Sequence, residues 1–343
     1  MIRFFLDKNS RKPYYSQLLE QFEAAAKDGL LKEGEILPSM NVLANELDLS
    51  KETVKKAYGI LCDRGLIEPR QGKGFYVKEP QGKYQRVLII SDAHSIYKQI
   101  LLSAFQNRLS EKGDYDVTVL VHNQNVDLLR YYLDLNLHAY DWFVVIPHFP
   151  FDSAIQKEVL RQLGRIPNRK LILLDRWTEE LPGNYGVVYQ NFGNDACEAL
   201  APYADEIRGK GRLSIIAMDS SLYKNVIVEG LKNFAAENDI EAVISNGIPA
   251  EIRPGDVCLI LSSQLENGLV AIKQKTEEAG LEIGRDVFII GYNDFPLNDL
   301  VLGGLTTIST DFSLMGETAA DMIVSGSPAR IHNVFRLVRR KTF

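Results

Sequence analysis

The sequence has few cysteines, and their spacing excludes the common metal and disulfide frameworks. Cys62, Cys197 and Cys258 are scattered along the chain, without a CxxC pair and without a histidine cluster nearby. Structural zinc sites and disulfide scaffolds of small secreted domains both depend on closer, regular spacings. We therefore expect reduced, mostly buried thiols and no bound metal.

Long apolar runs are also missing. No stretch approaches the roughly 18 consecutive apolar residues that a membrane-spanning helix needs. The first residues, "MIRFFLDKNSRKPYY", contain a short apolar patch followed by charges, which does not fit a secretory signal. We expect a cytoplasmic protein without a membrane partner.

Frequent catalytic and cofactor-binding motifs are absent as well. No GxGxxG follows the apolar run at residues 86–91, and the chain has neither a P-loop nor an HExxH motif. The five histidines have no motif around them: His94, His122, His138, His148 and His332. We expect no enzymatic activity, no catalytic residues and no cofactor.

Basic residues are too few to make the whole chain attractive to nucleic acid. The formal net charge is −6, but residues 1–80 hold 13 Lys and Arg against 12 Asp and Glu. Residues 81–343 hold 26 basic against 33 acidic residues. A polyanion would therefore be bound locally, by the first segment alone.

The first eighty residues begin with the pattern of two helices. Pro13 opens a helix whose apolar residues recur at spacings of three and four. Ser39 is placed to cap a second helix, "MNVLANEL", in which Val42, Leu43 and Leu47 share one face. A loop or short strand, "LKEGEILPS", lies between the two helices.

A third helix and a hairpin follow the tight turn "DLS". Ser50 is the expected cap, Val54, Ala57 and Leu61 form the inner face, and the lysines at 51, 55 and 56 lie outside. The segment "GLIEPRQGKGFYV" then predicts two short strands around a glycine-rich tip. Helices, turn, helix and basic hairpin in this order predict a winged helix-turn-helix.

Such a domain contacts DNA through the start of its third helix and through its wing. Two positions at the start of the second helix, the cap Ser39 and the following Asn41, are also candidates for contact with DNA. The candidate DNA-binding residues are Ser39, Asn41, Ser50, Lys51, Thr53, Lys55, Lys56, Arg70, Gln71, Gly72 and Lys73. The alternative is that the lysines form only a solvated helix face, with Glu52 and Lys56 as an i,i+4 pair.

The same segment resembles a known family of regulators. Residues 11–78 contain "GEILPSMNVLA", "LSKETVKKA", "LCDRGLI" and "QGKGFYV" in that order, and this series is similar to the DNA-binding domain of GntR-type regulators. Asn41 and Lys51 stand where that family commonly has arginine. Since asparagine reads adenine and lysine acts as a point charge on phosphate or guanine, the operator sequence stays open.

A polar stretch at residues 79–85 is a candidate linker, and the pattern changes after it. Short runs rich in Val, Ile and Leu alternate with amphipathic stretches at 96–112, 125–136, 152–164, 191–207, 222–238 and 266–279. Buried strands alternating with helices predict parallel α/β sheets. We expect residues 86–343 to form two lobes, with chain crossovers near Gln190, Asp294 and Gly326.

Ligands of such sheets bind at the carboxyl ends of the strands, where this chain places acids, amides and aromatic rings. The candidate effector-binding residues are Asp92, His94, Tyr97, His148, Asp175, Arg176, Trp177, Lys224, Ser262 and Asn293. These groups suit a ligand with many hydroxyls. The alternative is that a number of them only cap helices or close loops.

The second segment also resembles a known family. "LLDR", "GRDVFIIGYNDF", "LTTIS" and "MGETAADMI" are similar to the effector domain of LacI-type regulators, which has the fold of type I periplasmic sugar-binding proteins. The resemblance implies that Asp175, Ser262 and Asn293 bind sugar hydroxyls. Where the family has a sugar-binding arginine, this chain has Ile227, so Lys224 or Arg176 is left to replace it.

Together the two segments predict a multi-domain protein: an N-terminal winged helix-turn-helix plus a C-terminal two-lobed, periplasmic-binding-protein-like α/β domain. The combination is similar to arabinose-type repressors and fucose-responsive operon regulators. It implies a dimeric repressor that binds operator DNA and is controlled by a monosaccharide, with helices 96–112 and 266–279 as candidate dimer contacts. The alternatives are a nucleoside or phosphorylated metabolite as effector, a sugar-metabolising α/β enzyme, or a transport-type binding protein.

Overall fold

The structure is a computed structural model that describes residues 4–8, 10, 12–27, 30–78, 85–217, 222–261 and 265–343. The chain divides into two compact units. The first comprises Met1–Leu88, Gly113–Thr118 and Tyr131–Trp142, and the second comprises Ile89–Lys112, Val119–Arg130 and Phe143–Phe343. Most of the predicted linker lies outside the described residues, and Gln85 already begins a strand.

The N-terminal region up to residue 78, called the head below, contains the three predicted helices. They are α1 (Tyr14–Lys27), α2 (Met40–Leu47) and α3 (Lys51–Asp63). Ser39 caps α2 by accepting a hydrogen bond from the Val42 amide at 3.2 Å, and Ser50 caps α3 by accepting one from the Thr53 amide at 3.2 Å. Asp48 ends α2 in the left-handed region, with φ of 56°, which makes the turn between the two helices tight.

Strands β1 (Ile67–Arg70) and β2 (Gly74–Val77) form the predicted antiparallel hairpin. Gly72 and Gly74 have φ of +69° and +102°, a backbone conformation that glycine adopts without strain. An isolated antiparallel bridge also joins Ile36 to Tyr76, so the segment before α2 pairs with the wing at this point. The order of helices and strands confirms the winged helix-turn-helix.

The head has its own apolar core, drawn from all of these elements. Its fully or nearly buried members include Leu18, Phe22, Leu43, Val54, Ala57, Leu61 and Ile67. The expected inner face of α2 was wrong at one position, because Val42 is 47% exposed and Ala44 is buried in its place. Val42 lies directly after the first helical residues, beside Asn41, on the exposed surface of α2.

A six-stranded sheet forms the first lobe, in the order β13-β7-β6-β5-β3-β4. Its strands are β3 (Gln85–Ser91), β4 (Tyr115–Val121), β5 (Trp142–Val145), β6 (Leu171–Asp175), β7 (Gly186–Tyr189) and β13 (Arg330–His332). Strands β5, β6, β7 and β13 pair in parallel. Burial of β6 on both faces explains why its sequence is a continuous apolar run.

A second six-stranded sheet forms the second lobe, in the order β14-β12-β11-β10-β8-β9. Its strands are β8 (Leu213–Ala217), β9 (Ala242–Ser245), β10 (Val257–Leu261), β11 (Phe288–Tyr292), β12 (Thr306–Thr310) and β14 (Phe335–Val338). All of its pairings are parallel except that of β12 with β14. The prediction of two lobes with parallel α/β sheets is confirmed.

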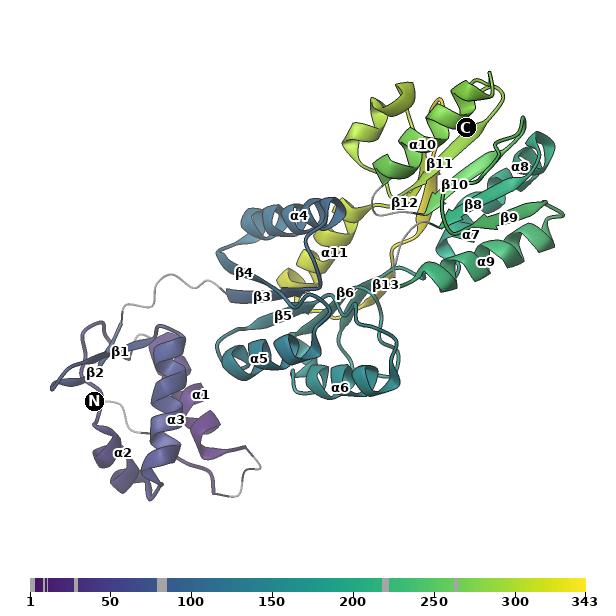
Figure 1. Cartoon of the computed structure of the whole chain (residues 1–343). Helices are drawn as coiled ribbons and strands as arrows, with labels where there is room; N and C mark the ends of the chain where they lie inside the picture. Colours follow the sequence, from purple (N-terminus) through teal and green to yellow (C-terminus); the bar gives the residue numbers. More distant parts are fainter. Residues whose placement is uncertain are drawn as a thin grey trace. The chain divides into compact units, whose positions relative to one another are not determined.

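Helices cover both faces of each sheet. The helices of the two lobes are α4 (Ile96–Lys112), α5 (Val126–Asn136), α6 (Ser153–Leu163), α7 (Asp195–Leu200), α8 (Ala204–Lys210), α9 (Lys224–Glu237), α10 (Leu265–Glu278) and α11 (Phe312–Ser325). Figure 1 shows α4 beside α11 on one face of the first sheet and α6 on the other. It also shows α9 and α10 on opposite faces of the second sheet. No helix in the described ranges has the length and apolar character to cross a membrane.

The chain passes between the lobes three times, and two of the predicted crossover positions were wrong. The first crossover follows β7 at residues 190–194, as expected near Gln190. The second lies at residues 310–311, between β12 and α11, and the third at residues 333–334, between β13 and β14. Asp294 instead stays in the second lobe, where Arg340 donates to it at 2.8 Å. Gly326 caps α11 within the first lobe.

Hydrogen bonds join the three crossovers to one another. The Thr310 hydroxyl donates to the Asn333 carbonyl at 2.7 Å, and the Asn333 side-chain amide donates to the Asp311 carbonyl at 2.8 Å. The Asn333 backbone amide donates to the Tyr189 carbonyl at 2.8 Å. The three connections therefore form one hydrogen-bonded hinge.

Candidate functional site

The outer face of α3 carries exposed cations. Lys51 and Lys55 point into solvent, and Lys55 lies 3.6 Å from the Glu52 carboxylate, an exposed pair that contributes little to stability. Glu52 therefore pairs with Lys55 and not with Lys56, the partner named in the alternative of a solvated helix face. Lys56 instead places its ammonium group 4.0 Å from the centre of the Tyr15 ring.

Hydroxyl groups at the start of α3 are already engaged with one another. The Ser50 and Thr53 hydroxyl oxygens lie 2.8 Å apart, and Ser50 also accepts from the Thr53 amide. The Ser39 hydroxyl at the start of α2 is also engaged, because it accepts a hydrogen bond from the Val42 amide. These side chains fix the helix starts, so a phosphate would meet them through backbone amides and the positive end of the helix dipole.

The tip of the wing is exposed and basic. Arg70, Gln71, Gly72 and Lys73 are all exposed, and a turn closes where the Lys73 amide donates to the Arg70 carbonyl at 2.9 Å. The Arg70 guanidinium lies 4.3 Å from the Tyr76 ring centre and donates to Glu68 at 2.8 Å. Asn41 is likewise exposed, at the start of α2.

In the first lobe, four neighbouring strands each contribute one polar residue at the same edge of the sheet. Gln190 follows β7, Asp175 ends β6, His148 follows β5 and Asp92 follows β3. Gln190 donates to Asp175, the Asp175 carboxylate lies 3.2 Å from Nε2 of His148, and Nδ1 of His148 lies 3.9 Å from Asp92. This polar row runs in the order of the strands, as carboxyl ends of parallel strands meet at one edge.

Asp175 is the best-enclosed member of the polar row, with none of its surface exposed. Its backbone has φ of +72°, which turns the chain sharply away from the sheet edge. Burial alone would raise the pKa of its carboxyl group, but the neighbouring His148 and Lys98 hold that pKa below its usual value.

Lys98 completes the polar row and was missed by sequence reasoning. It is only 2% exposed and forms a buried ion pair with Asp92. A signal was present, because Lys98 falls on the same helical stripe as the buried residues Leu101, Phe105 and Leu109 of α4. A lysine on the buried stripe of a helix needs a partner within the fold, since an unpaired buried charge is costly.

Side chains of both lobes meet above the polar row in an inter-lobe cluster, defined by His148, Phe151, Arg176, Phe192 and Tyr223. Tyr223, from the second lobe, stacks on Phe192 of the first crossover with ring centres 3.7 Å apart and planes 11° apart. Its ring also makes edge contacts with His148 at 5.2 Å and Phe151 at 5.6 Å. The Arg176 guanidinium lies 4.9 Å from the Phe151 ring and 5.9 Å from the Tyr223 ring.

The structure brings together only part of the predicted effector-binding set. Asp92, His148, Asp175 and Arg176 belong to the two clusters. Tyr97 lies next to the polar row, with its ring centre 5.3 Å from the Lys98 ammonium group. Burial raises the pKa of the Tyr97 phenol, and the charges of Asp175 and Asp92 raise it further. Trp177 turns elsewhere, to Tyr189 and Arg330, each at 5.2 Å. His94 is exposed, and Lys224 and Asn293 are half-buried at the start of α9 and the end of β11. Ser262 lies outside the described residues.

Besides Lys98, four residues of the polar row and the inter-lobe cluster were missed: Gln190, Phe151, Phe192 and Tyr223. Gln190 and Phe192 follow a short strand that the sequence pattern did not reveal. Ile227, which stands at the position of the family's arginine, is buried in the core of the second lobe. It therefore takes no part in the polar row, and Arg176 contributes a guanidinium to the inter-lobe cluster.

A histidine–carboxylate pair lies beside the hinge. Nε2 of His332 and the carboxylate of Asp195 are 2.6 Å apart, and Asp195 also accepts from the Asn191 amide at 2.6 Å. Burial raises the pKa of Asp195 although His332 opposes the shift. Glu198 brings a third potential metal ligand within 4.8 Å, but the two inner groups already satisfy each other and we assign no metal to them.

Comparison with known families agrees with this architecture. Residues 14–77 match the family described as "Bacterial regulatory proteins, gntR family", and residues 257–343 match "Periplasmic binding protein-like domain". The chain thus combines a winged-helix domain similar to the gntR family with a two-lobed α/β domain similar to periplasmic-binding-protein-like domains, as the two resemblances in the sequence predicted.

Individual relatives match the head alone. The "HTH-type transcriptional repressor YtrA" of Bacillus subtilis (strain 168) is 36% identical over 74 residues, which are 22% of this chain and 57% of that protein. The "Arabinose metabolism transcriptional repressor" of Geobacillus stearothermophilus is 33% identical over 78 residues, 23% of this chain and 21% of that protein. The chain spans little more than half, or less, of the curated relatives that it matches.

A solved structure covers the two lobes. The dimeric Lac repressor with an 11-residue C-terminal deletion superposes with a TM-score of 0.59 over 75% of this chain and 98% of that chain, at 17% sequence identity. At this identity the likeness establishes the fold. It does not show that the two proteins bind the same ligand.

Proposed function

We propose that this protein is a DNA-binding transcriptional repressor of carbohydrate-use genes, controlled by a monosaccharide bound between the two lobes. The observation that carries the proposal is the exposed cationic face of α3 and the wing on a chain of net charge −6. Such a charge distribution concentrates attraction for a polyanion on one small domain. Its chromosomal target would be in the cytoplasm.

The polar row and the inter-lobe cluster support a sugar as the effector. Carboxylate, amide and imidazole groups at one sheet edge offer acceptors and donors to neighbouring hydroxyls, while an aromatic ring packs on the C–H face of a sugar. The names of the arabinose and Lac repressors also point to sugar-responsive systems. Asp175, His148 and Arg176 are the residues that we propose to contact the effector.

Control of DNA affinity would pass through lobe movement. A ligand held by both lobes favours the arrangement in which both contact it, and it can shift that equilibrium only by its difference in affinity for the two arrangements. In a two-fold dimer, the spacing of the two heads must match two operator half-sites. A change in lobe arrangement that alters this spacing would therefore weaken specific binding.

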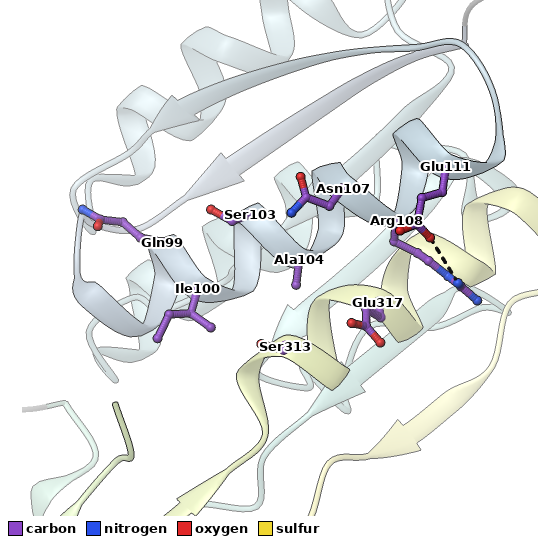
Figure 2. A pocket seen from close by; sticks show the side chains of 9 residues that line it. All are labelled: Gln99, Ile100, Ser103, Ala104, Asn107, Arg108, Glu111, Ser313 and Glu317. Carbon is purple, nitrogen blue, oxygen red and sulfur yellow. Dashed lines mark hydrogen bonds and ion pairs between the residues drawn. The ribbon is translucent and has the colours of Figure 1, made fainter. Parts of the chain in front are cut away.

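A homodimer is the assembly that we propose, with α4 as its main contact. A hollow of about 660 Å³ lies along α4 and α11. Figure 2 shows the side chains of the two helices that line it, most of them polar, including Gln99, Ser103, Asn107 and Glu317. Ile96, at the start of α4, is 61% exposed. Helix α10 is the alternative contact, since its Val270 is 65% exposed.

The test of this function is selection of duplex DNA by the purified full-length protein, followed by binding titrations over a range of salt concentrations. Replacing Lys51 and Lys55 by alanine is expected to weaken binding to the selected duplex. Each lost phosphate contact should also lower the salt dependence by about one unit of logarithmic slope. Lys273→Ala, which removes an exposed cation of α10, is the matched control and should bind as the wild type does.

Two results would contradict the proposal. An unchanged slope in the double variant would show that α3 is not the DNA-binding face. Turnover of a sugar that binds, detected as a new product by chromatography, would favour the alternative of a sugar-metabolising enzyme.

A further inference from the structure

Lys98 is a buried lysine to which the function proposed above gives no role. It lies in the first turn of α4, and only 2% of the residue is exposed. Its ammonium group forms an ion pair with the carboxylate of Asp92, which directly follows β3 and is itself only 4% exposed. The pair thus places two opposite charges inside the first lobe, at the sheet edge where the polar row runs.

A buried ion pair of this kind is a poor source of stability. Taking two charges out of water costs free energy that their attraction repays only in part, and apolar residues of similar volume often stabilise a fold at least as well. Lys98 shares its helical stripe with Leu101, Phe105 and Leu109, so an apolar residue at position 98 would continue the packing of α4. A charge that breaks the packing pattern without a gain in stability points to a function.

The Lys98 ammonium group has more donors than the fold uses. An ammonium group carries three N–H donors, and Asp92 is the single acceptor that the described ranges provide for it. Two further atoms of the polar row are in a similar condition, because Nε2 of His148 and Oδ2 of Asp175 lie 3.2 Å apart without a well-aligned hydrogen bond among the described residues. Both of these side chains are more than nine-tenths buried, where missing hydrogen bonds are costly.

Lys98 lies close enough to Asp175 for both to act on one ligand. Burial alone would raise the pKa of the Asp175 carboxyl group, but the charges of His148 and Lys98 lower it, and such effects weaken with distance. Asp92 connects the two ends of this group, since its second oxygen lies 3.9 Å from Nδ1 of His148. The unused donors of Lys98 and the unused acceptor of Asp175 therefore lie along one short stretch of the sheet edge.

We propose that Lys98 is an effector-binding residue, whose ammonium group donates hydrogen bonds to hydroxyl oxygens of the effector while Asp92 holds that group in place. The proposal rests on the function proposed above, since it requires a hydroxyl-bearing effector at the polar row. A hydroxyl group suits the row because the same oxygen can accept from Lys98 and donate to a carboxylate. An anionic group suits it less well, because Asp92 and Asp175 both carry negative charge there.

The experiment is isothermal titration of the full-length protein with a panel of aldopentoses, aldohexoses and 6-deoxyhexoses, followed by titration of variants with the sugar that binds. Lys98→Met combined with Asp92→Leu replaces the ion pair by apolar side chains of similar volume, so the protein should fold and melt at or above the wild-type temperature. It should bind the sugar about a hundredfold more weakly, because hydrogen bonds to a charged group are lost. Lys98→Met combined with Asp92→Asn keeps an uncharged polar group at position 92 and should lose as much affinity.

Arg108→Met combined with Asp321→Leu is the matched control. It removes another ion pair of α4, in which Nε of Arg108 lies 2.8 Å from the Asp321 carboxylate at a partly exposed position. Arg108 stands ten residues beyond Lys98, about 15 Å further along the helix. The control should bind the sugar as the wild type does. Circular dichroism and thermal melting check the fold of every variant.

The outcomes distinguish a failure of this inference from a failure of the proposed function. Unchanged affinity in a folded double variant would show that the ion pair is structural, which overturns the role of Lys98 and leaves the sugar effector in place. Near-normal affinity of the asparagine variant alone would assign the contact to Asp92 and would also overturn it. Failure of both double variants to fold would show that the pair serves stability, with the same consequence. If no member of the panel binds the wild type, the sugar effector and the role of Lys98 fail together.

Discussion

His122 is a buried histidine whose surroundings require it to be neutral. No part of it is exposed, its ring stacks on Phe149 at 4.1 Å, and its Nε2 lies 3.0 Å from the Ile146 carbonyl. Its Nδ1 accepts from the Gln124 amide at 3.1 Å. A proton on Nδ1 would remove that acceptor, and burial lowers the pKa of the imidazole to about 4.

This environment predicts a loss of stability in mild acid. The unfolded chain binds a proton near the ordinary histidine pKa of about 6.5, whereas the folded chain does so only near 4, so stability falls as the pH drops through this window. From about pH 7 to about pH 5, His122 should cost about 2 kcal/mol in the free energy of unfolding. Urea unfolding of the wild type and of His122→Gln at both pH values measures this difference.

The glutamine variant supplies the control, since it keeps a donor and an acceptor but does not titrate. All other titrating groups are common to both proteins and cancel in the comparison. Equal pH dependence in the two proteins would show that His122 is protonated in the folded chain at a normal pH.

At the scale of the elements, the packing of α9 on the first crossover is the tightest constraint near the effector region. A Cβ atom on Gly230 would lie 2.1 Å from the Gly193 carbonyl oxygen and 3.4 Å from the Cys197 sulfur. Backbone atoms cannot move aside as the end of a flexible side chain can. The glycine therefore allows α9 to lie directly against the hinge.

Gly230→Ala is accordingly expected to destabilise the protein by roughly 2 kcal/mol, because the helix must shift away from the crossover. Gly209→Ala is the matched control, since Gly209 lies in α8 with nothing within 4 Å of its would-be Cβ. That change should stabilise the protein by up to about 1 kcal/mol through helix propensity. Thermal unfolding of both variants measures the two effects, and similar melting temperatures would refute the tight packing.

The elements of the head were predictable because each has a local signal. Ser39 and Ser50 are caps, glycines mark the wing tip, and apolar residues recur at helical spacings. The inner strands of both lobes were predictable for a similar reason, since burial on both faces demands continuous apolar runs. The winged helix and the two-lobed fold thus follow from local sequence alone.

Other elements have no comparable local signal. β7, β9 and β13 have three or four residues each, and β9 and β13 lie at sheet edges with partly exposed residues, so periodicity does not distinguish them from loops. The crossovers near Asp294 and Gly326 were misplaced because β13 and α11 were not recognised. The contacts of Tyr223 with Phe192 and of Lys98 with Asp92 depend on tertiary packing. No regular spacing in the sequence marks such pairs, so they could not be predicted from one sequence.

At the scale of the whole molecule, the proposed dimer is the assembly that would connect the lobes to DNA. The two candidate interface helices can be distinguished by placing a charge on each. Ile100→Glu, in the hollow along α4, is expected to convert the dimer to monomers, because a buried unpaired carboxylate costs several kcal/mol at an interface. Val270→Glu, on α10, should leave the dimer intact.

Size-exclusion chromatography with light scattering measures the mass of each variant. Monomers produced only by the α10 variant would move the interface to that helix. A wild-type protein that is itself monomeric would contradict the proposed assembly.

The hinge has a consequence for how the molecule is made. β13 and β14 are edge strands of the two different sheets, and they are joined by only two residues, Asn333 and Val334. On the ribosome, the head has emerged and can fold around its own core long before either sheet receives its last strand. Under the proposed function, a nascent chain would thus be able to bind DNA before its lobes can respond to an effector.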